Sequence, residues 1–260
     1  MAEIRTQRDG AVATVVFSNP PRMNAMTMDM WLAVPRVIAE LDADPQVRVI
    51  VCKGDGDRAF ISGADISQFE KLRGTVEAQV EYNRAVEEAY VAPMKARKPV
   101  VASIRGVCMG GGLGFAAACD LRIAADDAVF RMPAARLGLG YSPAGVRRFM
   151  NVIGAANTCD IFFTARKFDA QEALRMGFLS KVVPVAELER ATAEICAMIA
   201  ENAPLTVAAA KFAVQQALKD PAERDMATAM RMVEACFASE DHKEGRRAFM
   251  EKRKPVFHGR

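Results

Sequence analysis

Three consecutive glycines, Gly110, Gly111 and Gly112, are the residues whose type and spacing most directly indicate chemistry in this chain. They follow the β-like run 100–104 and precede an alanine-rich helix former, so bare backbone N–H groups come to the start of a helix. Such a helix end stabilises negative charge. Glycine is needed where φ is positive or where a ligand must approach the main chain closely. The segment therefore predicts a main-chain site for an anion or an oxyanion.

A second turn of small residues, Ser62, Gly63 and Ala64, is expected to partner the glycines. It follows the β-like run 47–53 through a Gly-Asp-Gly-Asp turn. Two main-chain donors from different loops make an oxyanion hole, where loss of one donor costs roughly 3 to 4 kcal/mol of transition-state stabilisation. A tight strand-to-helix turn would explain the glycines alone but not the matching second turn, so we favour the functional interpretation.

A nicotinamide site is the competing interpretation, because residues 112–117 fit the dinucleotide pattern G-x-G-x-x-G/A. The next strand-like run begins at Leu121, which leaves space for only about two helical turns in a unit that normally needs ~30 residues. We therefore expect no nicotinamide cofactor.

Composition limits the partners and the compartment. The chain has 260 residues, 51% of them hydrophobic, and a net charge of +3, which is too balanced for a nucleic-acid-binding protein. Its six cysteines form no C-x-x-C pair and its two histidines are not clustered, so we expect reduced, buried thiols and no metal site. The amino terminus has no apolar leader and no apolar run could span a bilayer. A soluble, cytoplasmic protein with no membrane partner is expected.

The order of elements predicts an α/β fold up to about residue 200. Short β-like runs alternate with helical patterns, namely runs 12–17, 47–53, 100–104, 121–124 and 181–183. One helix is expected to begin near Thr27, with Pro35 bending it or marking its first turn, and another begins at an Asp169 cap and stops at Gly177. Beyond residue 201 only helical segments follow, at about 204–218, 221–238 and 241–252. We therefore divide the chain into a core, 1–200, which carries the site, and a helical region, 201–260.

The carboxy-terminal helices carry apolar residues on more than one side: Met226, Met230, Met232, Val233 and Phe237. Packing on the parent domain and packing against another subunit both explain this pattern.

Four segments together resemble the crotonase, or enoyl-CoA hydratase/isomerase, superfamily: residues 19–26, 59–66, 100–120 and 249–255. The resemblance runs from Ile4 to Phe257. It implies a spiral of ββα units followed by a helical region that makes a homotrimer or a dimer of trimers. It also implies an acyl-CoA thioester substrate of fatty acid metabolism, with coenzyme A as part of the substrate and no separate cofactor.

The same resemblance assigns the oxyanion hole to the N–H groups of Ala64 and Gly111, which would stabilise a thioester enolate. Contacts to coenzyme A are implied for Arg22, Ala25, Ser62, Ala64, Asp65, Ile66, Phe249 and Lys252. A neighbouring subunit can supply Lys252. Solvated surface charge is the alternative for Arg22 and Lys252, and turn stabilisation is the favoured role of Asp65.

Two departures from the family concern acid/base chemistry. The hydratases that this chain resembles carry glutamates at two positions where it has Gly114 and Ala134. Hydration needs a base for the water and an acid for the α-carbon, each contributing typically 10²- to 10⁴-fold. We therefore expect ordinary hydration to be slow, with Glu81 as a carboxylate that could reach the acyl pocket.

Tyr141 is the remaining candidate catalytic side chain. The segment 137–145 is similar to one in methylmalonyl-CoA decarboxylase, a crotonase relative whose tyrosine acts near the departing carboxylate, although that enzyme has a glutamate in place of Gly114 and a histidine in place of Ala64. Loss of CO₂ generates an enolate without a base. We therefore favour a lyase-type reaction, by decarboxylation or another C–C step. A family-typical hydratase or isomerase, a non-catalytic CoA-binding oligomer, and Tyr141 as a plain wall residue stay open.

Overall fold

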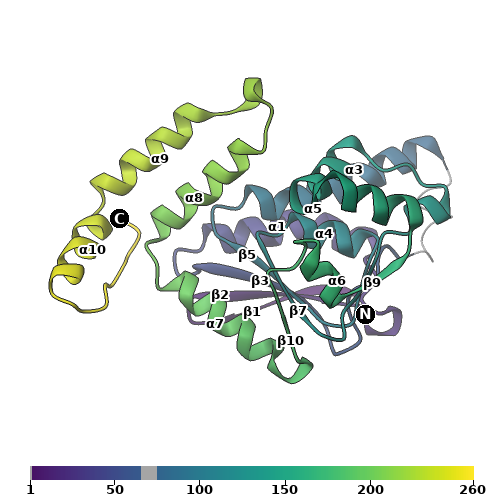
Figure 1. The fold of residues 1–260 in the computed structure, drawn as a ribbon, viewed down its shortest axis with the longest axis horizontal. Helices are drawn as coiled ribbons and strands as arrows, with labels where there is room; N and C mark the ends of the chain where they lie inside the picture. The colour runs from purple at the N-terminus through teal and green to yellow at the C-terminus, as the bar shows by residue number, and fades with distance from the viewer. Residues whose placement is uncertain (1, 66–74) are drawn as a thin grey trace.

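The computed structural model describes residues 2–65 and 75–260, so the prediction for Ile66 lies outside the described residues. Its larger sheet has the order β1-β2-β3-β5-β7-β10 and is parallel except for the antiparallel pair β1 and β2 (Figure 1). These strands are β1 (Glu3–Asp9), β2 (Val12–Ser18), β3 (Val49–Gly54), β5 (Val100–Ile104), β7 (Leu121–Ala125) and β10 (Lys181–Val183). The five β-like runs of the sequence therefore all become strands of one sheet.

A smaller sheet has the order β4-β6-β8-β9, with only β9 antiparallel to its neighbour. It contains β4 (Ala59–Ile61), β6 (Val107–Met109), β8 (Val129–Arg131) and β9 (Lys167–Asp169). The chain adds one strand to the larger sheet and then one to the smaller sheet, as β3 and β4, β5 and β6, and β7 and β8. This repeated step is the expected spiral, and the α/β prediction is confirmed.

Helices cover the sheets, and two of them begin at the caps expected from the sequence, Thr27 and Asp169. They are α1 (Met28–Ala43), α3 (Val76–Lys95), α4 (Gly111–Ala118), α5 (Pro143–Thr164), α6 (Ala170–Arg175) and α7 (Leu188–Ala200), with short 3₁₀ turns η1 (Pro20–Arg22), η3 (Ala134–Leu137) and η4 (Val185–Glu187). The Thr27 hydroxyl accepts from Met30 N–H at 3.3 Å, and the Asp169 carboxylate accepts from Glu172 N–H at 2.7 Å. Pro35 lies inside α1, beyond its first turn.

In the described part of the chain, no single helix is long and apolar enough to cross a membrane. Only the bent pair Val185–Ala200 and Pro204–Ala217 meets that criterion jointly, across a 104° bend.

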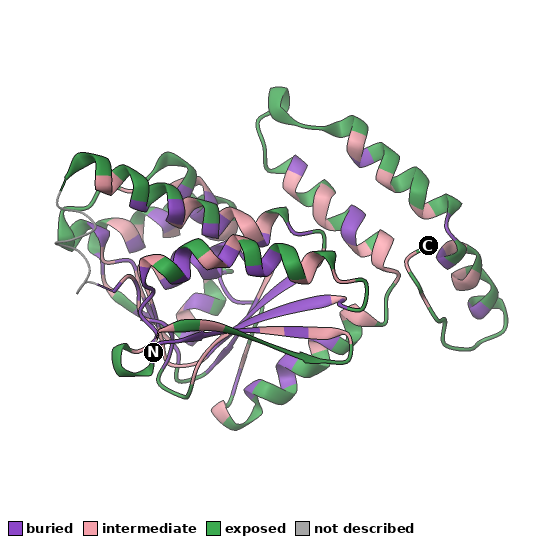
Figure 2. Cartoon of the chain, turned by 180° about the vertical axis from the view of Figure 1, so that it is seen from behind, coloured by how far each residue is buried: buried purple, intermediate pink, exposed green. Residues whose placement is uncertain are grey.

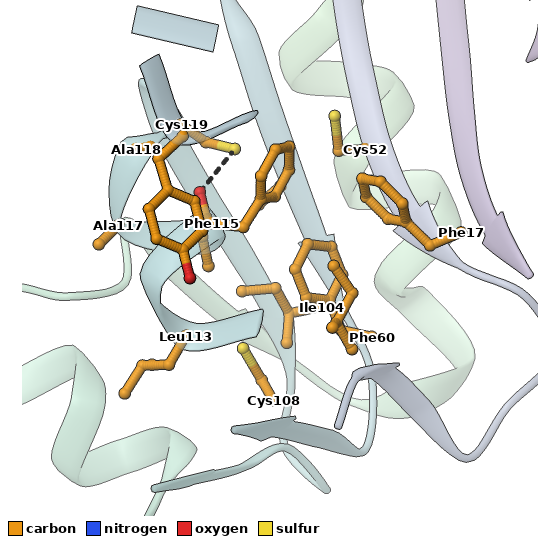
Figure 3. Close-up of a cluster of buried hydrophobic side chains, with 14 of the residues drawn as sticks. Phe17, Cys52, Phe60, Ile104, Cys108, Leu113, Phe115, Ala117, Ala118 and Cys119 are labelled. Atoms are coloured by element: carbon orange, nitrogen blue, oxygen red, sulfur yellow. Dashed lines mark hydrogen bonds between the residues drawn. The ribbon is translucent and has the colours of Figure 1, made fainter. Parts of the chain in front are cut away.

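Part of the larger hydrophobic core lies between the two sheets and α4 (Figure 3). The Phe17 and Phe115 rings meet edge to face with centroids 5.1 Å apart, and Phe60 packs against both. Cys108 lies in this core, and burial raises the pKa of its thiol. It is thus a packing residue. Four of the six thiols are buried, but Cys159 is exposed and Cys236 is half-buried, so the expectation of buried cysteines is wrong for these two.

The carboxy-terminal region consists of α8 (Pro204–Ala217), the turn η5 (Pro221–Glu223), α9 (Met226–Ala238) and α10 (Glu240–Met250). Lys211 fixes α8 to the core, because its Nζ lies 2.7 Å from the Asp120 carboxylate and donates to two backbone carbonyls. In contrast, α9 and α10 extend away from the sheets and are largely exposed (Figures 1 and 2). The division of the chain at residue 200 stays a prediction, although α7 does end at Ala200.

Candidate active site

The parallel strands β4 and β6 bring the two small-residue turns together. Ala64 follows β4 by three residues and Gly111 follows β6 by two, and β4 pairs directly with β6. Because parallel strands end at the same edge of a sheet, both turns face one cavity of about 360 Å³, which they line with Ser62, Gly63 and Gly110. The sequence-based pairing of these turns is therefore reproduced by the fold.

The two main-chain donors expected of an oxyanion hole are available. Within residues 2–65 and 75–260, neither Ala64 N–H nor Gly111 N–H donates to another main-chain group. Their neighbours are fixed: Met26 N–H donates to Gly63 O at 2.8 Å, and Asp65 N–H donates to Met26 O at 2.9 Å. The Gly111 amide is the first of α4, where the helix dipole adds to the attraction for an anion. Two fixed donors at a cavity wall can stabilise a developing oxyanion.

Gly112 allows the start of α4 to lie directly against the end of β4. A Cβ at this position would lie 2.2 Å from Ile61 O, at the end of β4. Any side chain would therefore push the start of α4 away from β4 and separate the two donors.

The space beside Gly114, where the hydratases resembled here carry a glutamate, is filled by two phenols. A Cβ on Gly114 would lie 2.8 Å from both the Tyr90 Oη and the Tyr141 Oη. Tyr90 donates from its hydroxyl to Gly111 O at 3.0 Å, while Tyr141 Oη is buried and has no hydrogen-bond partner among the described residues. The absent carboxylate is thus replaced by side chains from α3 and from the loop before α5.

Both tyrosines are neutral at physiological pH. Burial raises the pKa of Tyr90 well above its usual range, and the neighbouring Tyr141 raises it further. Burial also raises the pKa of Tyr141 to about 12. Each hydroxyl is therefore a hydrogen-bond donor in the cavity wall and not a general base.

A carboxylate does line the cavity, but it is Glu87 and not Glu81. Glu81 is exposed on α3, so the expectation that it reaches the pocket is wrong. Glu87 lies on the same helix and accepts from Arg148 Nη2 at 2.6 Å. Its side chain keeps 36% of its surface exposed, while that of Arg148 keeps 5%. Six residues turn a helix through about 600°, so the two glutamates point in different directions.

Sequence reasoning missed the part of the cavity wall that α1 and α3 supply. Aromatic side chains from distant segments form it, and Trp31 donates from its indole N–H to the Tyr82 hydroxyl at 3.1 Å. The lining residues from α3 recur at helical spacing: Tyr82, Asn83, Val86, Glu87 and Tyr90. That mixed apolar and polar stripe is the signal that could have identified them.

The segment 19–26 packs against the turn that carries Ala64, one side of the candidate oxyanion hole. Buried Asn24 donates to Asp55 O and Ala59 O at 2.9 and 2.7 Å, which anchors the loop to β4. Arg22 is exposed and lies 3.8 Å from the buried Asp65 carboxylate. The structure thus places Arg22 and Asp65 beside Ala64.

The other predicted residues divide into two groups. Ser62 lines the cavity and donates from its hydroxyl to Arg22 O at 3.1 Å, Ala134 also lines it, and Ala25 is buried behind it. Phe249 and Lys252, by contrast, are exposed at the end of α10 and are not among the residues that line this cavity. Within one chain they are not brought to the site.

Comparisons with known proteins agree with this geometry. The family model for enoyl-CoA hydratase/isomerase matches residues 7–260. The short-chain-enoyl-CoA hydratase of Clostridium acetobutylicum is 33% identical over 95% of this chain and 94% of its own length. The peroxisomal Δ(3,5)-Δ(2,4)-dienoyl-CoA isomerase of Arabidopsis thaliana is 30% identical over 98% of this chain and 95% of its own. A solved structure of an enoyl-CoA hydratase/carnithine racemase from Magnetospirillum magneticum superposes with a TM-score of 0.94 at 32% identity and covers 100% of this chain and 97% of that one. The fold, the paired turns and these relatives together show that the chain belongs to the enoyl-CoA hydratase/isomerase, or crotonase, family.

Proposed function

We propose that this acyl-CoA enzyme moves a carbon–carbon double bond along an enoyl-CoA thioester, with Glu87 as the proton carrier. One observation carries the proposal: among the described residues that line the cavity, Glu87 is the only carboxylate, and it shares the cavity with the unpaired N–H groups of Ala64 and Gly111. Isomerisation needs a single group that takes a proton and returns it, whereas hydration needs both a base for water and an acid for carbon.

The proposed reaction follows from these groups. The thioester oxygen of a 3-enoyl-CoA accepts from the N–H groups of Ala64 and Gly111. The Glu87 carboxylate removes a proton from the α-carbon, and the electron pair passes into a dienolate whose negative charge lies on the thioester oxygen. The double bond then shifts as the dienolate collapses, and Glu87 returns the proton to the γ-carbon. The product is the conjugated 2-enoyl-CoA, and the carboxylate is regenerated.

Two earlier expectations are less well supported. The relatives named above are a hydratase, an isomerase and a hydratase/carnithine racemase, and none of them supports the expected lyase-type reaction or the partial resemblance to methylmalonyl-CoA decarboxylase. Hydration is the second candidate, because the Clostridium relative at 33% identity is named a hydratase. It would require a second proton carrier, such as a bound water.

The test compares two glutamates of α3. Purified protein is given a 3-enoyl-CoA, and the conjugated product is followed by its absorbance. Glu87→Gln should lower kcat by about 10²- to 10⁴-fold, while Glu81→Gln, on the exposed face, should leave it within about twofold. Full activity of Glu87→Gln would refute the role of Glu87. Hydration of crotonyl-CoA at ~10 to 10³ s⁻¹, without isomerisation, would favour the second candidate.

The proposal includes an oligomer. The exposed apolar side chains of α9 and α10 are Met226, Met230, Val233, Phe237, Phe249 and Met250. Burial of such a surface against another subunit would explain it and would let Phe249 and Lys252 approach coenzyme A in a neighbouring site. A trimer or a dimer of trimers in sedimentation velocity is the expected result, and a monomer at micromolar concentration would refute it.

A further inference from the structure

Arg148, on α5, is a buried cation directly behind the cavity wall. Its side chain keeps only 5% of its surface exposed. Its Nη2 donates to Glu87 Oε1 at 2.6 Å, and its guanidinium carbon lies 5.0 Å from the centre of the Tyr90 ring. The same guanidinium therefore contacts the proposed proton carrier and an aromatic residue one helical turn further along α3.

Tyr90 extends this contact to the oxyanion hole. Its hydroxyl donates to Gly111 O at 3.0 Å, in the first turn of α4. Its ring meets Trp31 edge to face with centroids 5.6 Å apart, and Trp31 itself lies against Gly111, where a Cβ would be 3.0 Å from the indole. Through these contacts, Tyr90 helps to hold the turn that carries the Gly111 N–H donor in its orientation.

We propose that Arg148 is a positioning residue that holds Glu87 and, through Tyr90, the Gly111 turn in one fixed arrangement. The part that concerns Glu87 rests on the proposed function. The part that concerns Tyr90 and Gly111 rests only on the contacts described above, whatever reaction the site carries out.

The chemistry of the guanidinium supports this role. A planar guanidinium can stack on an aromatic ring and donate to a carboxylate at once, whereas the compact ammonium of lysine has no plane to stack. Arg148 also keeps its Nε and Nη1 buried with no hydrogen-bond partner among the described residues. Unsatisfied buried donors are costly and rare, so a cation kept in this position indicates a function beyond stability.

The experiment compares two adjacent arginines. Arg148→Lys keeps the charge but not the planar contact, and Arg148→Met removes the charge. Arg147→Lys and Arg147→Met are the matched controls, because Arg147 is next in the chain and pairs with the exposed Asp220. We expect both Arg148 variants to lose about 10- to 100-fold in kcat, as small misplacements of catalytic groups do, with KM changed less than about threefold. The Arg147 variants should stay within about twofold of wild type.

A second readout does not depend on activity. Trp31 is the only tryptophan of the chain, so intrinsic fluorescence reports directly on its contact with Tyr90. The emission maximum or intensity should change in both Arg148 variants and stay unchanged in both Arg147 variants. Tyr90→Phe, which keeps the ring but removes the hydroxyl, should lower kcat by about tenfold, and its effect should not add fully to that of Arg148→Met.

The outcomes separate the two proposals. If wild-type protein does not isomerise any enoyl-CoA, the proposed function fails, and Trp31 emission that changes in the Arg148 variants but not in the Arg147 variants would still support the positioning role. If folded Arg148→Lys keeps wild-type kcat and emission, the positioning role is refuted while isomerisation stands. Should Arg148→Met fail to fold, Arg148→Lys alone decides.

Discussion

Replacement of Gly114 by alanine tests whether the two phenols really occupy the space that a side chain would need. Inside a helix, alanine is preferred over glycine by about 1 kcal/mol. Here, however, the added Cβ would lie 2.8 Å from the hydroxyl oxygens of buried Tyr90 and half-buried Tyr141, and 2.9 Å from Tyr90 Cζ. Overpacking of this kind costs roughly 1 to 3 kcal/mol. Because the overpacking cost meets or exceeds the helix preference, Gly114→Ala should lower the free energy of unfolding by up to about 2 kcal/mol.

Gly245, inside α10, provides the matched control. A Cβ there would lie 3.6 Å from the nearest atom of Phe257, which is an ordinary contact. Gly245→Ala should therefore raise the free energy of unfolding by about 0.5 to 1 kcal/mol. Both variants are measured against wild type by urea denaturation followed by circular dichroism. If Gly114→Ala gained stability like the control, the phenols would not fill this space and the reasoning would be refuted.

Three further predictions concern stability and assembly. Lys211→Met should lower the free energy of unfolding by about 3 kcal/mol, because it leaves the Asp120 carboxylate, whose pKa burial already raises, without its cation; an unchanged urea midpoint would contradict this. The pKa of Tyr141 is about 12 in the folded protein and about 10 in the unfolded chain, so the neutral phenol stabilises the fold fully below pH ~10, and this stabilisation is lost as the pH rises toward 12. Phenylalanine does not titrate, so the free energy of unfolding of Tyr141→Phe should gain about 1 kcal/mol relative to that of wild type between pH 9 and 11. If the free energy of unfolding changed with pH in the same way for Tyr141→Phe and wild type, the predicted effect of Tyr141 would be contradicted. Phe249→Asp should dissociate the proposed oligomer in sedimentation velocity, whereas an intact oligomer would place the interface elsewhere.

The sequence alone predicted the scaffold of the site. Local signals sufficed for the five strands of the larger sheet and for the caps at Thr27 and Asp169, because propensity and capping depend on neighbouring residues. The pairing of Ala64 with Gly111 was also predictable. When two strands pair in parallel, the turns that follow them lie at the same edge of the sheet, so the two small-residue turns come together.

The short strands of the smaller sheet were not predictable in the same way. Strands β4, β6, β8 and β9 have three residues each, a length at which a period of two is hard to recognise, and of the three-residue strands only β10 was predicted. Likewise, Asp241 stands at capping-box spacing from Glu244, yet α10 is capped by Ser239, while Asp241 accepts from the His258 and Gly259 amides of the terminal segment.

The acid/base machinery was decided by tertiary structure. The sequence showed that Gly114 and Ala134 carry no carboxylate, but it could not show which glutamate of α3 faces the cavity. Glu81 and Glu87 have the same chemistry, and only the packing of α3 against α1 and α4 turns Glu87 toward Arg148. Such contacts join residues about 60 positions apart, and their energies depend on burial and on distance in space. A linear pattern records neither quantity, so the sequence determined the family and the oxyanion turns, while the three-dimensional fold determined the candidate proton carrier.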